Sequence, residues 1–353
     1  MYNNILLSIC IPTTNRKREL LELVRACQKI NSDRFDIIIT DNGSKDGTIE
    51  ALNRLNDKRV KVVENKDVLI PHLFMVKSIY NGDGSYALYC NDRDLIIPRR
   101  VENLIELLSH CEFCFISTEG KNKRNNNAVY IYDNCFESMC NQEHEHHPTG
   151  MVFNLDMIRN YIPFNKIKSF KDEKTIYYWD YLMRELFPYG KSARWNNGLW
   201  RQRSLRYLGA NRSSALKQSK NTYFLPENIQ YRQIKLFWHI FKSKHFEFNE
   251  DEKFYIMKRI VLKYSNLGGN YKVNIASPEL TYRYGLEPKF IHLLEILKIN
   301  ISYLLNIRKY FLRNQYPLKW ACWINRYMAL SFFISVGKDF KNNLSLIKQS
   351  IFK

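Results

Sequence analysis

The sequence of 353 residues predicts an α/β fold with a largely parallel sheet, followed by a mainly helical, basic region. Over roughly the first 120 residues, short apolar runs alternate with segments of helical periodicity, which is typical of a parallel sheet with helices on both faces. Beyond about Pro226 the apolar residues mostly follow helical spacing. We therefore expect an α/β domain over residues 1–225 and a helical region over residues 226–353.

The first half of the chain supplies the strand and helix signals in order. Buried parallel strands read as continuous apolar runs, whereas helices show apolar residues three and four apart. Proline near the first turn supports the helix that begins at Pro98. The predicted strands are Ile5–Ile11, Phe35–Thr40, Arg59–Glu64, Ser85–Cys90 and Cys111–Ser117, and the predicted helices are Lys17–Ile30, Thr48–Leu55, Pro71–Tyr80 and Pro98–Ser109.

The second half gives weaker signals. The polar stretch Lys121–His147 predicts a loop or insertion, and a helix is expected near Thr175–Phe187. The helices predicted beyond Pro226 are Ile229–Lys242, Asp251–Leu267, Glu287–Asn300, Ile301–Arg313 and a segment past Pro317.

The net charge of +19 favours polyanions, anionic lipid head groups or phosphorylated substrates as partners. No zinc-finger, RNA-binding or helix-turn-helix pattern is present, so nucleic acid is not expected. Lys289–Lys353 holds eleven Lys or Arg against two acids. The segment Met1–Pro12 lacks the features of a signal peptide, and the longest apolar run, Tyr327–Val336, is too short to cross a bilayer. We expect a cytoplasmic protein with reduced cysteines.

One group of cysteines and histidines raises the alternative of a zinc site. Its members are Cys111, Cys114, Cys135, Cys140, His144, His146 and His147. In the predicted strand, Cys111 and Cys114 are three residues apart and face opposite sides, which does not suit chelation of one ion. We therefore expect buried cysteines and solvated loop histidines.

Two polar loops directly follow predicted strands, at the edge where such sheets bind ligands. In Asp41–Gly47, either Ser44 or Asp46 caps the next helix, or Asp41 accepts hydrogen bonds from a nucleobase or ribose. In Asn91–Asp94, Asp92 and Asp94 either form a solvated turn or bind a hard divalent cation such as Mg²⁺ or Mn²⁺.

Three motifs in this order resemble the family 2 glycosyltransferases with the GT-A fold, of the bacterial capsule, O-antigen and cell-surface glycan type. The motifs are CIPTTNR at residues 10–16, FDIIITDNGSKDGT at 35–48 and SYALYCNDRDLIIP at 85–98. The resemblance covers residues 5–118 well and weakens toward about residue 206. It implies a nucleotide-binding half over residues 1–118 and an acceptor-binding half over 119–225.

The resemblance implies a site for a nucleotide sugar, with UDP as the nucleotide, and for Mn²⁺ or Mg²⁺ at Asp92 and Asp94. Two departures from the family pattern are Thr14, where an aromatic residue is usual, and Arg93, which replaces the middle carboxylate. The implied nucleotide-sugar-binding residues are Thr13, Asn15, Arg16, Asp41, Asn42, Asp92 and Arg93.

The acceptor half is implied by two further matches. His147-Pro-Thr-Gly150 resembles a small-residue turn before a helix that faces the acceptor, which assigns Thr149 and Gly150 to acceptor binding. Asp180, in WDYLMREL, matches a carboxylate that serves as general base, with Asp172 and Glu173 in reserve. Nearby arginines contact the leaving diphosphate or form a solvated surface; they are Arg201, Arg203 and Arg206.

These matches imply an inverting single displacement onto a glycan or lipid-diphosphate-linked acceptor. The basic C-terminal helices either dock on the inner face of the cytoplasmic membrane or pack as a homo-oligomer or against the core. Alternatives are a catalytically inactive relative that acts as a scaffold, and a polyanion- or nucleic-acid-binding protein. A nucleotidyltransferase is disfavoured because the loop after the first strand lacks glycine.

Overall fold

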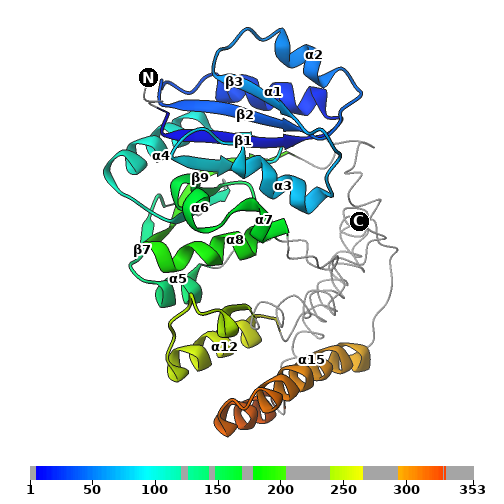
Figure 1. Cartoon of the computed structure of the whole chain (residues 1–353), viewed down its shortest axis with the longest axis vertical. Helices are drawn as coiled ribbons and strands as arrows, with labels where there is room; N and C mark the ends of the chain where they lie inside the picture. Colours follow the sequence, from blue (N-terminus) through cyan, green and yellow to red (C-terminus); the bar gives the residue numbers. More distant parts are fainter. Residues whose placement is uncertain are drawn as a thin grey trace, which may run out of the picture. The chain divides into compact units, whose positions relative to one another are not determined.

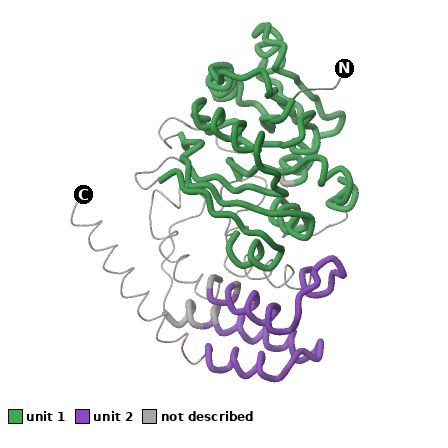
Figure 2. The backbone as a smooth tube through the Cα atoms, turned by 90° about the vertical axis from the view of Figure 1, so that its left-hand side faces the viewer, with its two compact units in different colours: residues 1–210 green, residues 211–353 purple. Residues whose placement is uncertain are grey.

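The computed structural model describes residues 5–120, 126–142, 148–168, 178–203, 239–264, 293–328 and 330 (Figure 1). The chain divides into two compact units, residues 1–210 and 211–353 (Figure 2). The predicted domain boundary at residue 225 lies outside the described residues and stays a prediction.

Unit 1 is built on one sheet, in which the described residues form nine strands in the order β3-β2-β1-β4-β8-β6-β9-β5, with β7 beside β9. The pairs β1–β2, β1–β4, β2–β3 and β6–β9 are parallel, whereas β8, β5 and β7 run antiparallel to their neighbours. This confirms the predicted, largely parallel α/β sheet. The strands are β1 (Leu7–Thr13), β2 (Phe35–Asp41), β3 (Val60–Glu64), β4 (Tyr86–Tyr89), β5 (Asp94–Ile96), β6 (Phe115–Gly120), β7 (Val129–Tyr132), β8 (Met151–Asn154) and β9 (Ser192–Gln202).

Helices connect these strands. The two longest have their apolar residues on one side, which packs against the sheet. In α1 (Lys17–Cys27) the buried residues are spaced three or four apart, and α4 (Pro98–His110) repeats the pattern. Strands β1 and β2 are buried at every residue, which explains their unbroken apolar runs. The other helices of unit 1 are α2 (Thr48–Asn53), α3 (Pro71–Tyr80), α5 (Cys135–Asn141), α6 (Leu155–Tyr161), α7 (Phe164–Lys168) and α8 (Tyr178–Leu186), which the 3₁₀ turn η1 (Phe187–Tyr189) follows.

Over residues 111–147 the structure differs from the sequence predictions in two places. The stretch Lys121–His147 is not all loop, because it contains β7 and α5. The predicted strand Cys111–Ser117 begins only at Phe115, so the argument from opposite strand faces does not apply to its cysteines. Cys114 and Cys140 are buried, as expected, whereas Cys111 is exposed at the end of α4. His144, His146 and His147 lie outside the described residues.

The described part of unit 2 consists of helices packed around Trp320. The helices are α12 (Glu250–Tyr264), α15 (Leu293–Arg313), a helical segment over 318–328 and a short one over 239–242, within the helix predicted over Ile229–Lys242. The Trp320 ring contacts Phe254 of α12 and Phe311 of α15, with ring centroids 5.5 Å and 5.0 Å away. The two helices predicted over Glu287–Asn300 and Ile301–Arg313 meet in the single helix α15, since no Gly or Pro interrupts residues 293–313. No helix in the described ranges has the length and apolarity needed to cross a bilayer.

Candidate active site at the carboxyl edge of the sheet

The two polar loops predicted to bind ligand meet at one edge of the sheet. Thr13 and Asp41, the last residues of β1 and β2, are partners in the parallel register. Strand β4 lies on the other side of β1, so the segment after Tyr89 continues alongside Thr13. There the Thr13 hydroxyl donates a hydrogen bond to Asp92 Oδ2 at 3.0 Å. The structure thus brings together side chains from the ends of three neighbouring strands.

Hydrogen bonds between backbone and side chains join the loop after β1 to the loop after β2. The Asn15 amide donates to Ser44 Oγ at 2.8 Å, and the Lys45 amide donates to Asn15 Oδ1 at 2.6 Å. The Lys17 amide donates to Asp46 Oδ2 at 3.0 Å, so Asp46 binds the first turn of α1. Asn15 has a φ of 51°, a left-handed conformation that asparagine tolerates. These bonds fix the two loops relative to each other.

Asp41 organises its own turn. Its Oδ2 accepts hydrogen bonds from the Gly43 and Ser44 amides at 2.9 and 2.8 Å, and its Oδ1 accepts one from the Ser44 hydroxyl. The Asn42 side chain pairs with the backbone of Leu69, accepting from its N–H at 2.9 Å and donating to its C=O at 3.0 Å. Both side chains therefore position the loops, and their contacts with a nucleoside stay a prediction.

The other loop brings two arginines together around Asp92. Arg16 Nη1 lies 2.7 Å from Asp92 Oδ1, and the negative charge of Asp92 raises the pKa of Arg16. Because the Thr13 hydroxyl donates a hydrogen bond to Oδ2 and Arg16 contacts Oδ1, both oxygens of this buried carboxylate have a partner. Burial lowers the pKa of Arg93, and the positive charge of Arg16 lowers it further. Arg16 and Arg93 thus both bring positive charge to this edge of the sheet, which favours a bound anion.

Asp94 has a different environment. It was predicted to end a tight turn, but it is the first residue of strand β5, where it pairs with Gln202 of β9. The carboxylate is 0% exposed. Its Oδ2 accepts hydrogen bonds from the Thr149 hydroxyl at 2.5 Å and from Asn91 Nδ2 at 3.3 Å. The Thr149 oxygen also accepts from the Asn91 amide at 3.0 Å, which holds Asp94 to the end of β4. Sequence reasoning missed this role of Thr149 and of Asn91, although Asn91 flanks the two carboxylates.

The turn at Thr149-Gly150 does not lead into a helix, as the sequence predicted, but into strand β8. Helix α6 begins only at Leu155, where the Asn154 side chain caps it by accepting from the Met157 amide. Gly150 has a φ of 97°, and its amide donates to the Tyr89 carbonyl at 2.9 Å. The turn therefore connects two adjacent strands, and the acceptor contacts predicted for Thr149 and Gly150 stay a prediction.

Asp180 lies in the first turn of α8. The eight other residues of this helix are buried, and Asp180 alone is half-buried. Trp179, which stands where the family has an acid, packs in the interior. The reserve carboxylates Asp172 and Glu173 lie outside the described residues.

The arginines near the end of β9 have separate environments. The side chain of Arg203 is 3% exposed, and its Nη1 lies 2.7 Å from Glu22 of α1. Its Nη2 donates to the Glu19 carbonyl at 2.8 Å. Arg203 is therefore a structural residue that ties β9 to α1. Both predicted alternatives, contact with a diphosphate and a solvated surface charge, are wrong for this residue. Arg201 is exposed, and Arg206 lies outside the described residues.

The oxygen atoms around Asp94 suit a hard divalent cation. They come from the carboxylate and the Thr149 hydroxyl, since Asn91 directs its Nδ2 toward Asp94, whereas softer metals prefer sulfur or imidazole ligands. Within the described ranges, no cluster of three or more His, Cys, Asp or Glu side chains forms a complete cage. Mg²⁺ and Mn²⁺ fit such an incomplete set, because substrate phosphates and water supply their remaining ligands.

Comparisons with known proteins agree with this geometry. Residues 8–162 match the family model for glycosyl transferase family 2. No curated protein sequence matches the chain. Among solved structures, residues 1–349 of TarS from S. aureus give a TM-score of 0.58 at 11% identity, covering 98% of this chain and 91% of that one. The same TarS fragment in complex with UDP-GlcNAc gives 0.56 at 13% identity, with the same coverage.

A second neighbour is the mannosyltransferase PcManGT from Pyrobaculum calidifontis, in complex with GDP-Man and Mn²⁺. It gives a TM-score of 0.50 at 11% identity and covers 95% of this chain and 86% of that one. At these identities the likeness shows the fold. Residues 8–162 therefore match glycosyl transferase family 2, and the chain shares the GT-A fold of these solved structures.

Proposed function

We propose that the chain transfers a sugar from a UDP-sugar to a hydroxyl group of a glycan or lipid-diphosphate-linked acceptor in bacterial surface polysaccharide synthesis. The reaction is a single displacement with inversion. The observation that carries the proposal is the convergence of Thr13, Asp41, Asp92 and Asp94 at one edge of the sheet. Complexes of TarS with UDP-GlcNAc and of PcManGT with GDP-Man support a nucleotide-sugar donor.

The charges at this edge suit a sugar diphosphate. Arg16 neutralises Asp92, so this carboxylate does not repel the donor and holds the guanidinium in place. Arg93 adds a second positive charge nearby. Asp94, supported by Asn91, would hold a divalent cation. When bound, such an ion neutralises the charge that grows on the leaving diphosphate. Asp92 is the less suitable metal ligand of the two predicted, because both of its oxygens are already engaged.

Asp180 is proposed as the general base. The acceptor hydroxyl must lose its proton as it attacks the anomeric carbon, and a carboxylate with access to solvent and substrate performs this step. Asp180 is the one residue of α8 that is not buried. In this proposal Thr149 positions Asp94 through its hydroxyl, and Gly150 shapes the turn that carries Thr149.

A melting experiment tests the donor site. The full chain is heated with a panel of UDP- and GDP-sugars, with Mn²⁺ or with EDTA. A donor at 100 times its Kd stabilises the folded state by about 2.7 kcal/mol, which raises Tm by about 4 °C for a chain of 353 residues. We expect a UDP-sugar to give this shift with Mn²⁺ and a smaller one with EDTA.

Three variants complete the test. Asp94→Asn should lose the Mn²⁺-dependent part of the shift, whereas Asp156→Asn, an exposed acid of α6, should keep it. Asp180→Asn should bind donor normally and lose sugar transfer. The proposal fails if no sugar nucleotide shifts the melting of the wild type, or if Asp94→Asn responds as the wild type does. Donor binding without transfer to any acceptor of this class would favour an inactive relative.

A further inference from the structure

Helix α15 presents two contrasting faces. One face is buried against unit 2 and carries Tyr303, Leu304, Ile307 and Phe311, each at most 1% exposed. These residues follow the spacing of three and four that places side chains on one side of a helix. The packing of Phe311 against Trp320 shows that this face completes the core of the unit.

The opposite face is exposed although it contains apolar residues. Ile301, Leu305 and Leu312 are 39%, 38% and 41% exposed. Between and beside them lie exposed basic residues, and Lys309 follows Lys298 by eleven positions, close to three helical turns. We call this surface the outer face of α15; it consists of Lys298, Ile301, Leu305, Lys309, Leu312 and Arg313.

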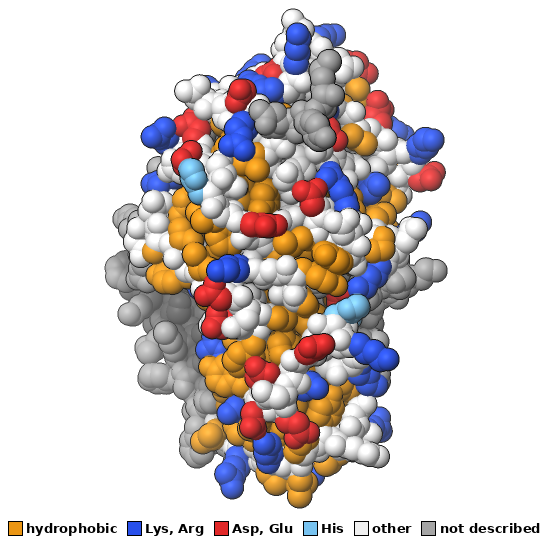
Figure 3. Space-filling view, turned by 60° about the vertical axis from the view of Figure 1, so that its left-hand side comes forward, with side chains coloured by type: hydrophobic (Ala, Val, Ile, Leu, Met, Phe, Trp, Pro, Cys, Tyr) orange, Lys and Arg blue, Asp and Glu red, His pale blue; other side chains and the backbone are white. Residues whose placement is uncertain are grey.

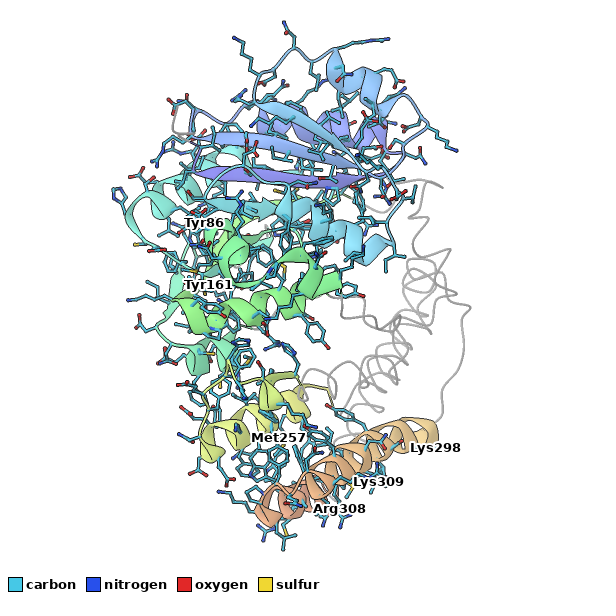
Figure 4. The ribbon with its side chains drawn as sticks, viewed as in Figure 1. Tyr86, Tyr161, Met257, Lys298, Arg308 and Lys309 are labelled. Carbon is cyan, nitrogen blue, oxygen red and sulfur yellow. The ribbon has the colours of Figure 1, made fainter. Side chains whose placement is uncertain are left out.

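The charge of α15 is almost entirely of one sign. Its cations are Lys298, Arg308, Lys309 and Arg313, and its single acid is Glu295. Figure 4 labels the first three of these cations along the helix. None of the four forms an ion pair with another residue that the structure describes. Figure 3 shows apolar side chains at the surface between Lys and Arg side chains toward the lower end of the view.

The exposed apolar residues and the cations on the outer face of α15 together favour one class of partner over others. A second copy of the same face would place like charges opposite each other in a two-fold contact, which opposes self-association. Nucleic acid would use the cations and leave the apolar row exposed. The surface of an anionic bilayer uses both, because apolar side chains enter the head-group region while Lys and Arg contact lipid phosphates.

We propose that the outer face of α15 binds the surface of an anionic lipid bilayer, with Ile301, Leu305 and Leu312 inserted among the head groups. The helix lies on the membrane in this arrangement, in agreement with its failure to meet the requirements for a spanning helix. The proposal depends on α15 alone and not on glycosyl transfer, so its failure would leave the proposed function intact.

Vesicle sedimentation of the full chain tests the proposal. The vesicles contain either phosphatidylcholine alone or phosphatidylcholine with phosphatidylglycerol. We expect binding to the second and much weaker binding to the first. Each lysine near an anionic surface contributes about fivefold in partitioning, so Lys298→Gln/Lys309→Gln should lower it by more than tenfold. Leu305→Ser/Leu312→Ser should lower it at least tenfold by removing buried apolar area.

Matched controls lie in unit 1. Val129→Ser/Ile131→Ser removes two apolar residues of β7 that are 37% and 49% exposed. Arg18→Gln/Arg99→Gln lowers the net charge by the same two units, and both side chains are exposed. Both controls should bind as the wild type does, and melting temperatures confirm that every variant folds.

Three results would overturn the proposal. The first is equal binding of the wild type to both kinds of vesicle. The second is loss of binding in the controls as large as in the α15 variants, which would indicate a general charge effect. The third is a wild-type dimer in sedimentation that Leu305→Ser/Leu312→Ser converts to a monomer without change in vesicle binding; this would assign the face to a second copy.

Discussion

Replacement of Gly150 by alanine tests how tightly the turn before β8 is built. Its φ of 97° is a conformation that costs an L-residue about 1–2 kcal/mol. An added Cβ would also clash with Thr118 Oγ1 and lie only 2.7 Å from the Trp200 indole nitrogen. The Thr118 hydroxyl cannot turn away freely, because it donates to the Gly150 carbonyl at 2.9 Å. Overpacking of this kind costs about 1–3 kcal/mol, so Gly150→Ala should lower the free energy of unfolding by about 2–5 kcal/mol.

Urea denaturation followed by tryptophan fluorescence measures this loss, and Gly120→Ala is the matched control. A Cβ at Gly120 would approach the same Trp200 ring at 3.1 Å, without a clash as close as that at Gly150 and without a positive φ. Its loss should be clearly smaller. If the two variants were equally stable, or if Gly150→Ala stayed within about 0.5 kcal/mol of the wild type, the turn would be more adaptable than this geometry implies.

Two further outcomes follow from the site and from a surface loop. Thr149→Val removes the hydroxyl that donates to Asp94 and accepts from the Asn91 backbone N–H. It should lower the free energy of unfolding by about 2–4 kcal/mol and should weaken donor binding, measured by calorimetry, more with Mn²⁺ than with EDTA. Thr149→Ser should restore both the stability and the binding. A hydrogen bond from Arg59 lowers the pKa of Asp57 to about 2 in the folded state. Between this pKa and the ordinary value near 4, the unfolded state binds more protons than the folded state. Asp57 therefore contributes stability above about pH 4, and this contribution is lost as the pH falls toward 2. Asp57→Asn should thus be about 1–2 kcal/mol less stable than the wild type at pH 5 and nearly equal to it at pH 2 in urea titrations, and a deficit independent of pH would contradict this account.

The first half of the fold could be predicted because its signals are local. Strand β2 and its turn lie within one stretch of sequence, and burial on both faces makes the apolar run unbroken. Helix α3 was predicted with its observed bounds, since proline marks its start. Asp41 and Asp92 were placed at the correct edge for the same reason: Asp41 ends strand β2 and Asp92 closely follows strand β4 of the parallel sheet.

The features that could not be predicted depend on residues far apart in the sequence. Asp94 belongs to a strand only because β9 pairs with it about a hundred residues later, and no local pattern reports such pairing. Strand β7 is short, exposed and surrounded by asparagine, so its signal is lost among loop residues. Arg203 resembles a surface charge until α1 provides Glu22 as its partner.

The late position of β9 in the sequence determines when strand β5 can pair during synthesis. The family match ends at residue 162, yet the strand that pairs with both β6 and β5 begins at Ser192. A nascent chain that has emerged only to the end of the matched region contains Asp94 and its hydrogen-bond partner Thr149, but it lacks Gln202, which pairs with Asp94 in the sheet. The pairing that places Asp94 in strand β5 therefore forms late in synthesis, when the segment up to Gln202 has left the ribosome.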